Sequence, residues 1–352
     1  MIYYLCKKNY SDTVKSFLAT WGRDLKSHLR VIPYETFFRK KYLPAGTYFF
    51  SDLERLSALE AETAAIVWRE LRSQWAEEIR LLNHPTISLS RFELLRQLFN
   101  EGINDYNVYR MAGDSLPHRF PVFLRNVNEH EGPYSELLST PQELHDAIQR
   151  LDENGKSREN KMIVEYCDTS DKNGLFRKYS CFNVSGLIIP RHIYFGRNWM
   201  LKYPDLFESE IIQEEIDFMQ MNPHEAQLKK IFALAHIDYG RIDYSIKHGQ
   251  IQVWEINTNP HIAGFISAQN PARLPIHEAF LKIIIPALRL TSNTDLRGKV
   301  KNPLRRLERI KHFSQITKSV AEEIIYSLPI SIQTKASIHY RMRALKSRII
   351  PR

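Results

Sequence analysis

The segment from Gly240 to Pro260 constrains the fold more than any other part of the sequence. It reads GRIDYSIKHGQIQVWEINTNP and alternates polar with apolar residues on both sides of a short Lys-His-Gly stretch, which predicts an antiparallel β-hairpin. Side chains of a strand point to alternate faces, so Arg241 and Asp243 share one face of the first strand. Glu255 and Asn257 share one face of the second.

The length of the turn decides whether these two polar sets meet. A three-residue loop that ends at Gly249 brings them together, whereas a two- or four-residue turn places Asp243 beside Trp254 and separates them. Glycine suits the third position of a three-residue turn, where the backbone is left-handed. We therefore expect one polar surface formed by Arg241, Asp243, Glu255 and Asn257.

Such a surface has the ligands of a magnesium site. Two carboxylates and an amide oxygen suit Mg²⁺, which prefers oxygen ligands and shares its shell with substrate phosphates. Arg241 beside them can neutralise negative charge that develops during phosphoryl or acyl transfer. The alternative is a surface strand whose polar residues form cross-strand ion pairs. The opposite face is apolar and packs under either interpretation, with Ile242, Tyr244, Trp254 and Ile256 on it.

The stretches Gly-Arg-Ile-Asp (240–243) and Glu-Ile-Asn-Thr-Asn-Pro (255–260) resemble the metal-binding end of ATP-grasp enzymes, such as D-alanine–D-alanine ligases and RimK-like ligases. The resemblance implies one or two Mg²⁺ ions, or Mn²⁺, that bridge the phosphates of ATP. Asp243, Glu255 and Asn257 would hold the metal, and Arg241 would stabilise the tetrahedral intermediate.

Upstream segments follow the order of the same family and imply ATP contacts. Phe120–Arg125 resembles a strand that ends in a phosphate-binding lysine, with Arg125 in its place. Ile163–Cys167 resembles the hinge that holds adenine, and Glu165 matches the hinge acid. The hairpin formed by 176–184 and 187–195 offers further candidates for phosphate or substrate contacts, each of which is otherwise a solvated edge-strand residue. These candidates are Lys178, Arg191 and His192.

Alternation of strands and capped helices predicts an α/β fold in three parts. The resemblance implies that residues 1–84 form an N-terminal α/β domain of the kind that precedes an ATP-grasp core, and that residues 85–290 form the two-lobed ATP-grasp domain. Residues 291–352 are expected to form a basic, mostly helical tail. Capping boxes predict three helix starts. They are Ser51 with Glu54, Ser90 with Glu93, and Thr140 with Glu143.

The net charge of +9 is concentrated in the tail, where residues 291–352 hold 14 Lys and Arg but 4 Asp and Glu. Basic residues interleaved with Leu, Ile and Phe are typical of segments that bind an anionic membrane surface or a nucleic-acid backbone. Such contacts are expected through residues 300–352. The alternative is a tail helix that packs on its own domain or on a partner subunit.

Composition narrows the class of protein. The three cysteines are scattered, which argues against a disulfide framework and indicates a cytoplasmic protein, with peripheral membrane attachment only through the tail. The resemblance implies an ATP-dependent ligase that joins a small-molecule or peptide carboxylate to an amine, through an acyl phosphate, with release of ADP. A small-molecule kinase of the same fold and a binding module that works through the tail remain alternatives.

Overall fold

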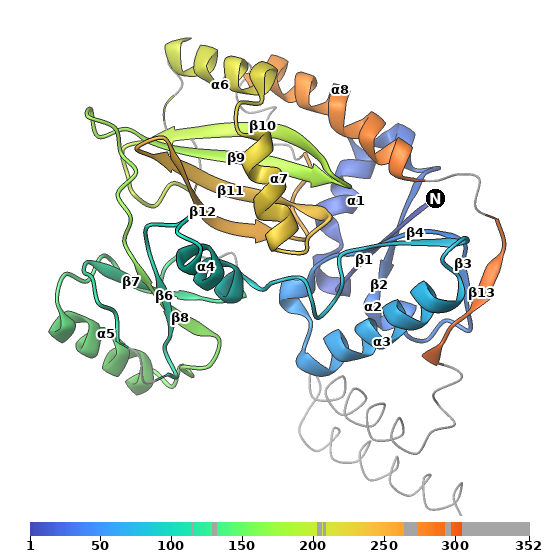
Figure 1. Cartoon of the computed structure of the whole chain (residues 1–352), viewed down its shortest axis with the longest axis horizontal. Coiled ribbons are helices and arrows are strands. Elements are labelled where there is room, and N and C mark those ends of the chain that lie inside the picture. Colours follow the sequence, from blue (N-terminus) through green and yellow to red (C-terminus); the bar gives the residue numbers. More distant parts are fainter. Residues whose placement is uncertain are drawn as a thin grey trace, which may run out of the picture.

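The computed structural model describes residues 1–113, 116–128, 132–202, 206, 209–263, 273–292 and 297–304. These residues form an N-terminal α/β domain, a small lobe and a large lobe (Figure 1). The α/β fold class expected from the sequence is confirmed. No helix among the described residues is long and apolar enough to cross a membrane.

The N-terminal domain is a parallel four-stranded sheet covered on both faces. Its strands lie in the order β2-β1-β4-β5. Tyr4 and Phe49 face the core that includes α1, whereas Tyr3 and Leu5 face the core that includes α2 and α3. The elements are β1 Ile2–Cys6, α1 Asp12–Ala19, β2 Leu29–Pro33, α2 Tyr34–Phe37, β3 Tyr42–Pro44, β4 Gly46–Phe50, α3 Ala58–Gln74 and β5 Ile79–Leu82. Short 3-10 helices lie at Lys8–Tyr10, Arg23–Leu25 and Leu53–Arg55.

The capping box of α3 lies six residues later than the sequence suggested. Ser57 accepts from the backbone of Glu60, and Glu60 accepts from the backbone of Ser57. The expected pair, Ser51 and Glu54, does not cap the helix, because Asp52 adopts a left-handed conformation and a 3-10 turn follows it. The other two predicted caps, at Ser90 and Thr140, are confirmed.

The first residues of the predicted tail belong to this domain. β13 (Lys299–Lys301) pairs with β3, and Val300 and Leu304 are buried in the same core as Tyr3 and Leu5. A separate tail therefore cannot begin at residue 291 as expected, because residues 297–304 complete the N-terminal domain. Residues 305–352, where most of the basic residues lie, are outside the described residues.

The small lobe is a three-stranded antiparallel sheet with one helix packed on it. The strand order is β6-β8-β7, and Leu124 and Ile163 pack against Leu144, Ala147 and Leu151 of α5. Helix α4 lies between the small lobe and the large lobe (Figure 1). The elements are α4 Arg91–Asn100, β6 Val108–Arg110, β7 Val122–Asn126, α5 Pro141–Glu153 and β8 Lys161–Glu165.

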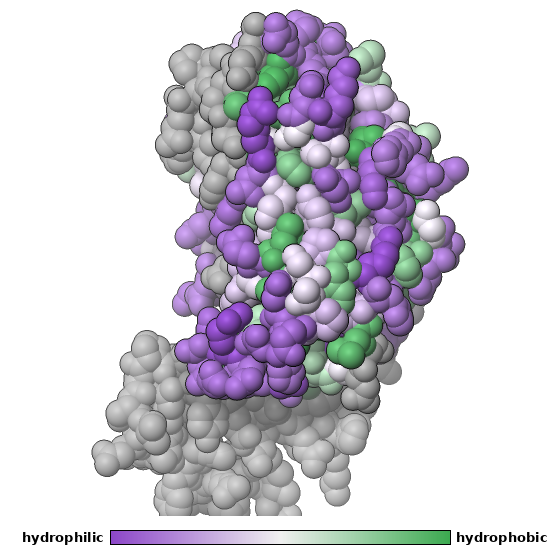
Figure 2. Space-filling model, turned by 90° about the vertical axis from the view of Figure 1, so that its left-hand side faces the viewer, coloured by the Kyte–Doolittle hydropathy of each residue, from purple (hydrophilic) through white to green (hydrophobic). Residues whose placement is uncertain are grey.

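The large lobe is an antiparallel sheet in the order β10-β9-β11-β12, with one apolar and one polar face. Tyr179 and Tyr244 stack on the apolar face and contact Phe218 of α6 and His224 beside α7. The polar face carries the predicted site. The elements are β9 Phe176–Val184, β10 Leu187–Gly196, α6 Ser209–Met221, α7 Glu225–Leu234, β11 Tyr239–Lys247, β12 Gln250–Asn257 and α8 Leu274–Thr291. The face on the left-hand side of Figure 1 is mostly hydrophilic, with hydrophobic residues scattered across it (Figure 2).

Candidate active site

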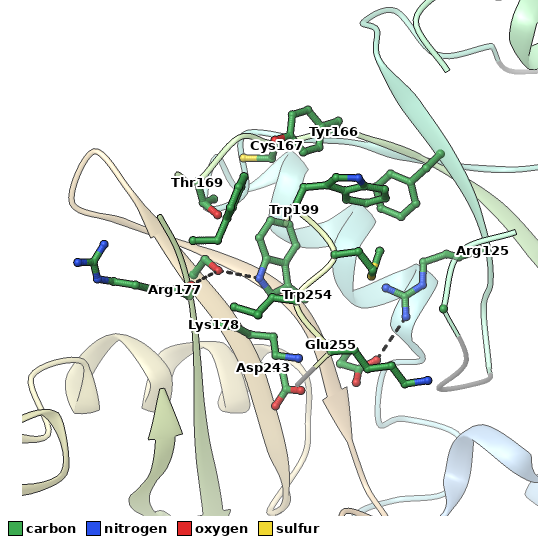
Figure 3. Close-up of a pocket in the computed structure, with 17 residues that line it drawn as sticks. Arg125, Tyr166, Cys167, Thr169, Arg177, Lys178, Trp199, Asp243, Trp254 and Glu255 are labelled. Carbon is green, nitrogen blue, oxygen red and sulfur yellow. Dashed lines mark hydrogen bonds and ion pairs between the residues drawn. The ribbon is translucent and has the colours of Figure 1, made fainter. Parts of the chain in front are cut away.

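A cavity between the small and large lobes is built from both lobes and from the segment after β10 (Figure 3). Strand β7 and the residues after β8 form one wall, and β9, β11 and β12 form the other. The lining residues are Phe123, Arg125, Gly132, Tyr166, Cys167, Thr169, Phe176, Arg177, Lys178, Trp199, Met200, Leu201, Lys202, Asp243, Ser245, Trp254 and Glu255.

One end of the cavity is aromatic. The ring of Trp199 lies 4.9 Å from that of Phe123 and 5.9 Å, edge-on, from that of Tyr166, measured between centroids. Met200, Leu201 and Cys167 add apolar atoms beside them. A flat aromatic base can pack at such a surface, because aromatic rings attract one another in offset-stacked and edge-to-face arrangements and bury a large apolar area.

The other end is charged. Figure 3 shows the side chains of Lys178, Asp243, Glu255 and Arg125 together, across the cavity from Trp199 and Tyr166. Asp243 and Glu255 are direct cross-strand partners in the β11–β12 ladder. Side chains of such partners have Cβ atoms about 5 Å apart, so both carboxylates can reach one ion.

The turn that joins these strands differs from the expected one. Lys247 pairs with Gln250, so the turn has two residues, and both His248 (φ 48) and Gly249 (φ 78) are left-handed. The prediction of a three-residue turn was wrong, and only the left-handed Gly249 is confirmed. Two consecutive left-handed residues form the turn whose twist matches that of the flanking strands.

The polar residues nevertheless share one face because a β-bulge shifts the register by one residue. Tyr244 pairs with Val253, but Asp243 pairs with Glu255, so Trp254 is the extra residue. A bulge opposes two residues to one and re-aims side chains. Consequently Trp254 lines the cavity beside Glu255, whereas the alternation had placed it on the opposite, apolar face.

Hydrogen bonds fix the carboxylate of Asp243. Ser180 of β9 donates its hydroxyl to Oδ1 at 2.6 Å, and Arg241 donates from Nε to the same oxygen at 2.9 Å and from Nη2 to Oδ2 at 3.2 Å. Burial disfavours the charge of Arg241, but Asp243 outweighs it, so the pKa of Arg241 is raised. Arg241 is therefore a permanent positive charge at the end of the cavity.

Glu255 lies between two arginines. Arg91, the first residue of α4, pairs with its Oε2, and Nη2 of Arg125 lies 3.6 Å from the same atom. Arg91 also donates to the carbonyls of Asn126 and Val127 at 3.2 and 3.1 Å, so it ties α4 to the end of β7. Burial, and repulsion from Arg91, lower the pKa of Arg125 to about 10.

Lys178 supplies a further cation to this end. Its ammonium lies 5.3 Å from the ring centroid of Tyr194 and points toward Asp243 (Figure 3). Burial lowers the pKa of Lys178, and Asp243 partly offsets that effect. Placing Arg125 and Lys178 at one end of a cavity favours an anionic ligand, as the sequence predicted for both residues.

Two predicted ATP contacts lie elsewhere. Glu165 is buried away from the cavity, where its carboxylate accepts from Arg119, from the hydroxyl of Tyr109 at 2.9 Å and from the backbone of Asn107 at 3.0 Å. The residues that follow it, Tyr166 and Cys167, line the cavity instead. Strand alternation turns Glu165 to the opposite side.

Arg191 is also absent from the cavity lining. A bulge in β10 between Pro190 and His192 turns it toward α8. His192, another candidate, is buried on the polar face and stacks on Tyr194 at 3.9 Å between centroids.

Sequence reasoning missed Arg91 and Trp254. Arg91 had a detectable signal, since a cation in the first turn of a helix opposes the helix dipole and so indicates another role. Trp254 had none, because a bulge leaves no mark in an alternating pattern. Its indole Nε1 donates to Ser245 at 3.0 Å, and its ring lies 5.2 Å from that of Tyr106.

The donor set fits a hard divalent cation. Asp243 and Glu255 supply carboxylates, and Asn257, opposite Arg241, supplies an amide oxygen that already accepts from the backbone of Asn259 at 2.8 Å. No three His, Cys, Asp or Glu side chains in the described part of the chain could hold a metal by themselves. Oxygen ligands that are too few for a closed cage suit Mg²⁺, which completes its shell with water and phosphate.

Neither a model of a known protein family nor the sequence of a curated protein matches this chain. Several solved structures are similar to it. One is D-alanine–D-alanine ligase from Bacillus anthracis complexed with ATP, at 13% identity over 82% of this chain and 98% of that chain, with a TM-score of 0.43. Another is D-alanine–D-alanine ligase from Helicobacter pylori, at 11% identity over 82% and 98%, with a TM-score of 0.45.

The ATP-grasp ligase PsnB, complexed with a variant of its minimal precursor, Mg and ADP, is similar at 11% identity over 82% of this chain and 96% of that chain, with a TM-score of 0.44. These similarities each cover 82% of this chain at low sequence identity. The function proposed below depends on the geometry of this chain's own cavity.

Proposed function

We propose that this protein is an ATP-dependent ligase that joins a carboxylate to an amine. The main support is one cavity with two different ends. One end is aromatic, and at the other end two cross-strand carboxylates lie beside Lys178 and Arg125. That combination matches a nucleoside triphosphate bound with Mg²⁺, whose base is flat and apolar and whose phosphates are anionic.

The residues of the cavity divide the work of binding ATP. The base stacks at Trp199 and Phe123, and the backbone after β8 at Tyr166 and Cys167 reads its edge. Lys178 and Arg125 hold the phosphates. Arg125 acts as a planar fork where a lysine acts as a point charge, so it binds two phosphate oxygens side by side.

Mg²⁺, or Mn²⁺, would be held by Asp243, Glu255 and Asn257, one ion or two, and would offset the charge of the phosphates. Ser180 and Arg241 keep the carboxylate of Asp243 fixed toward that site. When ATP binds, Lys178 and Arg125 orient the terminal phosphate.

The reaction runs in two displacements. A substrate carboxylate attacks the γ-phosphorus of ATP, and the bond from this phosphorus to the oxygen of the β-phosphate breaks. The products of this step are ADP and an acyl phosphate. The amine then attacks the acyl carbon, loses a proton and expels phosphate, which gives the amide. Arg241 stabilises the negative charge that develops on the acyl oxygen. Holding the reactants in line contributes much of the rate enhancement.

Hydroxylamine tests the acyl phosphate directly. The full-length protein is incubated with Mg-ATP, a library of carboxylates and hydroxylamine, and ADP and hydroxamate are measured together. The proposal expects equal amounts of both with the correct carboxylate. ADP with a stable phosphorylated alcohol and no hydroxamate would identify a kinase. AMP and pyrophosphate would exclude the acyl-phosphate route.

A further inference from the structure

Beyond the charged end of the cavity, a cluster of arginines lies around the contact between Arg191 of β10 and His277 of α8. Arg241 continues the polar face past Asp243, and Arg241 and Arg273 both lie close enough to Arg191 for their charges to interact with it. None of these three side chains lines the cavity that fits ATP. They form a second cluster of positive charge, which Arg241 joins to the charged end of the cavity through its ion pair with Asp243.

Acidic partners account for two of the three arginines. Arg241 pairs with Asp243, and Arg273 pairs with Glu215. Arg191 has no carboxylate within ion-pair distance among the described residues. Burial, with repulsion from Arg241 and Arg273, lowers the pKa of Arg191 to about 10. Holding a partly buried cation without an ion-pair partner costs stability, which points to a ligand as the missing partner.

The guanidinium of Arg191 is held in place by neutral groups. Its Nε donates to the carbonyl of Ile262 at 3.3 Å, its Nη2 donates to Nδ1 of His277 at 3.2 Å, and its plane lies 4.6 Å from the ring centroid of Phe280. Burial lowers the pKa of His277 to about 4, so the ring is neutral at pH 7 and can accept that bond. A guanidinium has five N–H donors, and these two bonds leave the others for a ligand.

A β-bulge in β10 determines where the side chain of Arg191 lies. The bulge in β10 makes Arg191 the extra residue between Pro190, which pairs with Cys181, and His192, which pairs with Ser180. Ser180 in turn donates to Asp243, so the residue next to Arg191 in β10 is connected through Ser180 to the proposed metal ligand Asp243. Bulges next to active sites commonly aim a side chain in this way.

We propose that Arg191 binds a carboxylate of a substrate, distinct from the carboxylate that ATP activates, so that one of the two substrates carries a second, unreactive carboxylate. This rests on the proposed ligase function. A single unpaired cation matches one negative charge, and a planar fork matches the two oxygens of a carboxylate. Phosphate carries more charge and already has Lys178 and Arg125 in the cavity.

Acetate is the simplest probe of such a position. The thermal midpoint of the full-length protein is measured with increasing sodium acetate against sodium chloride at equal ionic strength, for the wild type, Arg191→Met, Arg191→Lys and Arg289→Met. A ligand that binds the folded state stabilises it by mass action. Arg289 is exposed on α8, so Arg289→Met controls for the loss of one surface charge. Circular dichroism verifies that each variant is folded.

The wild type and Arg289→Met should gain stability with acetate beyond the effect of chloride. Arg191→Met should lose that gain, with a tenfold or larger rise in the apparent Kd, since a hydrogen bond to a charged group is removed. Arg191→Lys should keep part of it. No acetate effect in the wild type, or the same effect in Arg191→Met, would overturn the proposal. Inorganic phosphate that binds more tightly than acetate, and only with Arg191 present, would identify a phosphate subsite instead.

Two further measurements separate this proposal from the ligase function. ADP binding should be unchanged in Arg191→Met, because Arg191 does not line the cavity. With a pair of ligase substrates, Arg191→Met should raise KM for the substrate that carries the second, unreactive carboxylate. It should leave kcat with hydroxylamine nearly unchanged. If the wild-type protein does not bind ADP, the proposed ligase function is refuted, whereas the acetate result still decides the role of Arg191.

Discussion

At the scale of single residues, the charged end of the cavity should be needed for turnover and not for folding. Asp243→Asn, Glu255→Gln and Arg241→Met should each lower kcat by about 10²-fold or more, the effect of removing one stabiliser of transition-state charge. Steady-state ADP release measures this. Glu225→Gln, an exposed carboxylate on α7, is the control. Near-normal rates in any of the three variants would contradict the role assigned to it.

Asp52 should make the stability of the protein depend on pH. Burial, and repulsion from Glu54, raise the pKa of Asp52 to about 6, above its ordinary value. A raised folded-state pKa means that the folded protein binds the proton more tightly than the unfolded chain does. The contribution of Asp52 is therefore fully present below about pH 4 and is lost as the pH rises through 6.

Replacing Asp52 by Asn removes this ionisation while keeping a side chain that tolerates its left-handed backbone. Relative to the wild type, the free energy of unfolding of Asp52→Asn should therefore rise between pH 4 and pH 7 by up to about 3 kcal/mol. Urea unfolding at several pH values measures the difference. Asp152→Asn, at an exposed helix residue, should show no such rise. A difference that is constant with pH would contradict the assigned burial of charge.

At the scale of elements, the sequence predicted what local patterns determine. The hairpins of β9–β10 and β11–β12 and the caps of α4 and α5 depend on alternation, turn residues and capping boxes, and the structure has them. The predicted meeting of Asp243 and Glu255 is also present, but for another reason. The turn is one residue shorter than expected, and the bulge at Trp254 restores the register.

Bulges were not predictable because they depend on contacts with neighbouring strands and helices. Two of them set the site, since Trp254 enters the cavity and Arg191 turns toward α8. Glu165 was predicted to contact ATP but lies away from the cavity. Its position matched the family pattern, but which face of β8 meets the cavity is decided by how the two lobes pack. Tertiary packing, and not local sequence, thus fixed the details that matter for chemistry.

Gly249 should be required by the tight β11–β12 turn. Its φ of 78° is strained for any residue with a Cβ, although nothing lies within 4 Å of where that Cβ would be. Gly249→Ala should therefore destabilise the protein by about 1 kcal/mol through backbone strain alone. Thermal unfolding measures this, with Gly113→Ala, whose φ is not positive, as the matched control. Equal stability of the two variants would contradict the two-residue turn.

At the scale of the whole molecule, residues 297–304 link the end of the lobes back to the N-terminal domain. β13 adds a strand to β3, and Val300 and Leu304 are 6% and 3% exposed. Burying each of these side chains contributes about 2 kcal/mol. A chain that stops at 296 should consequently unfold at a lower temperature than one that stops at 304. Equal midpoints would show that this segment contributes nothing to the core.

The basic residues from 305 onward should be separable from the chemistry for the same reason. A chain of residues 1–304 keeps every described lining residue of the cavity and every described residue of the N-terminal core, so it should bind ADP as the full chain does. It should lose any salt-sensitive binding to RNA or to anionic liposomes, because exposed charges are screened over about 8 Å at physiological salt. Sedimentation with each partner at low and high salt measures this for both chains. If the shortened chain loses ADP binding, the basic segment is part of the nucleotide site. If the full chain binds neither partner at low salt, the basic residues act within the protein, and the interaction role of the tail is refuted.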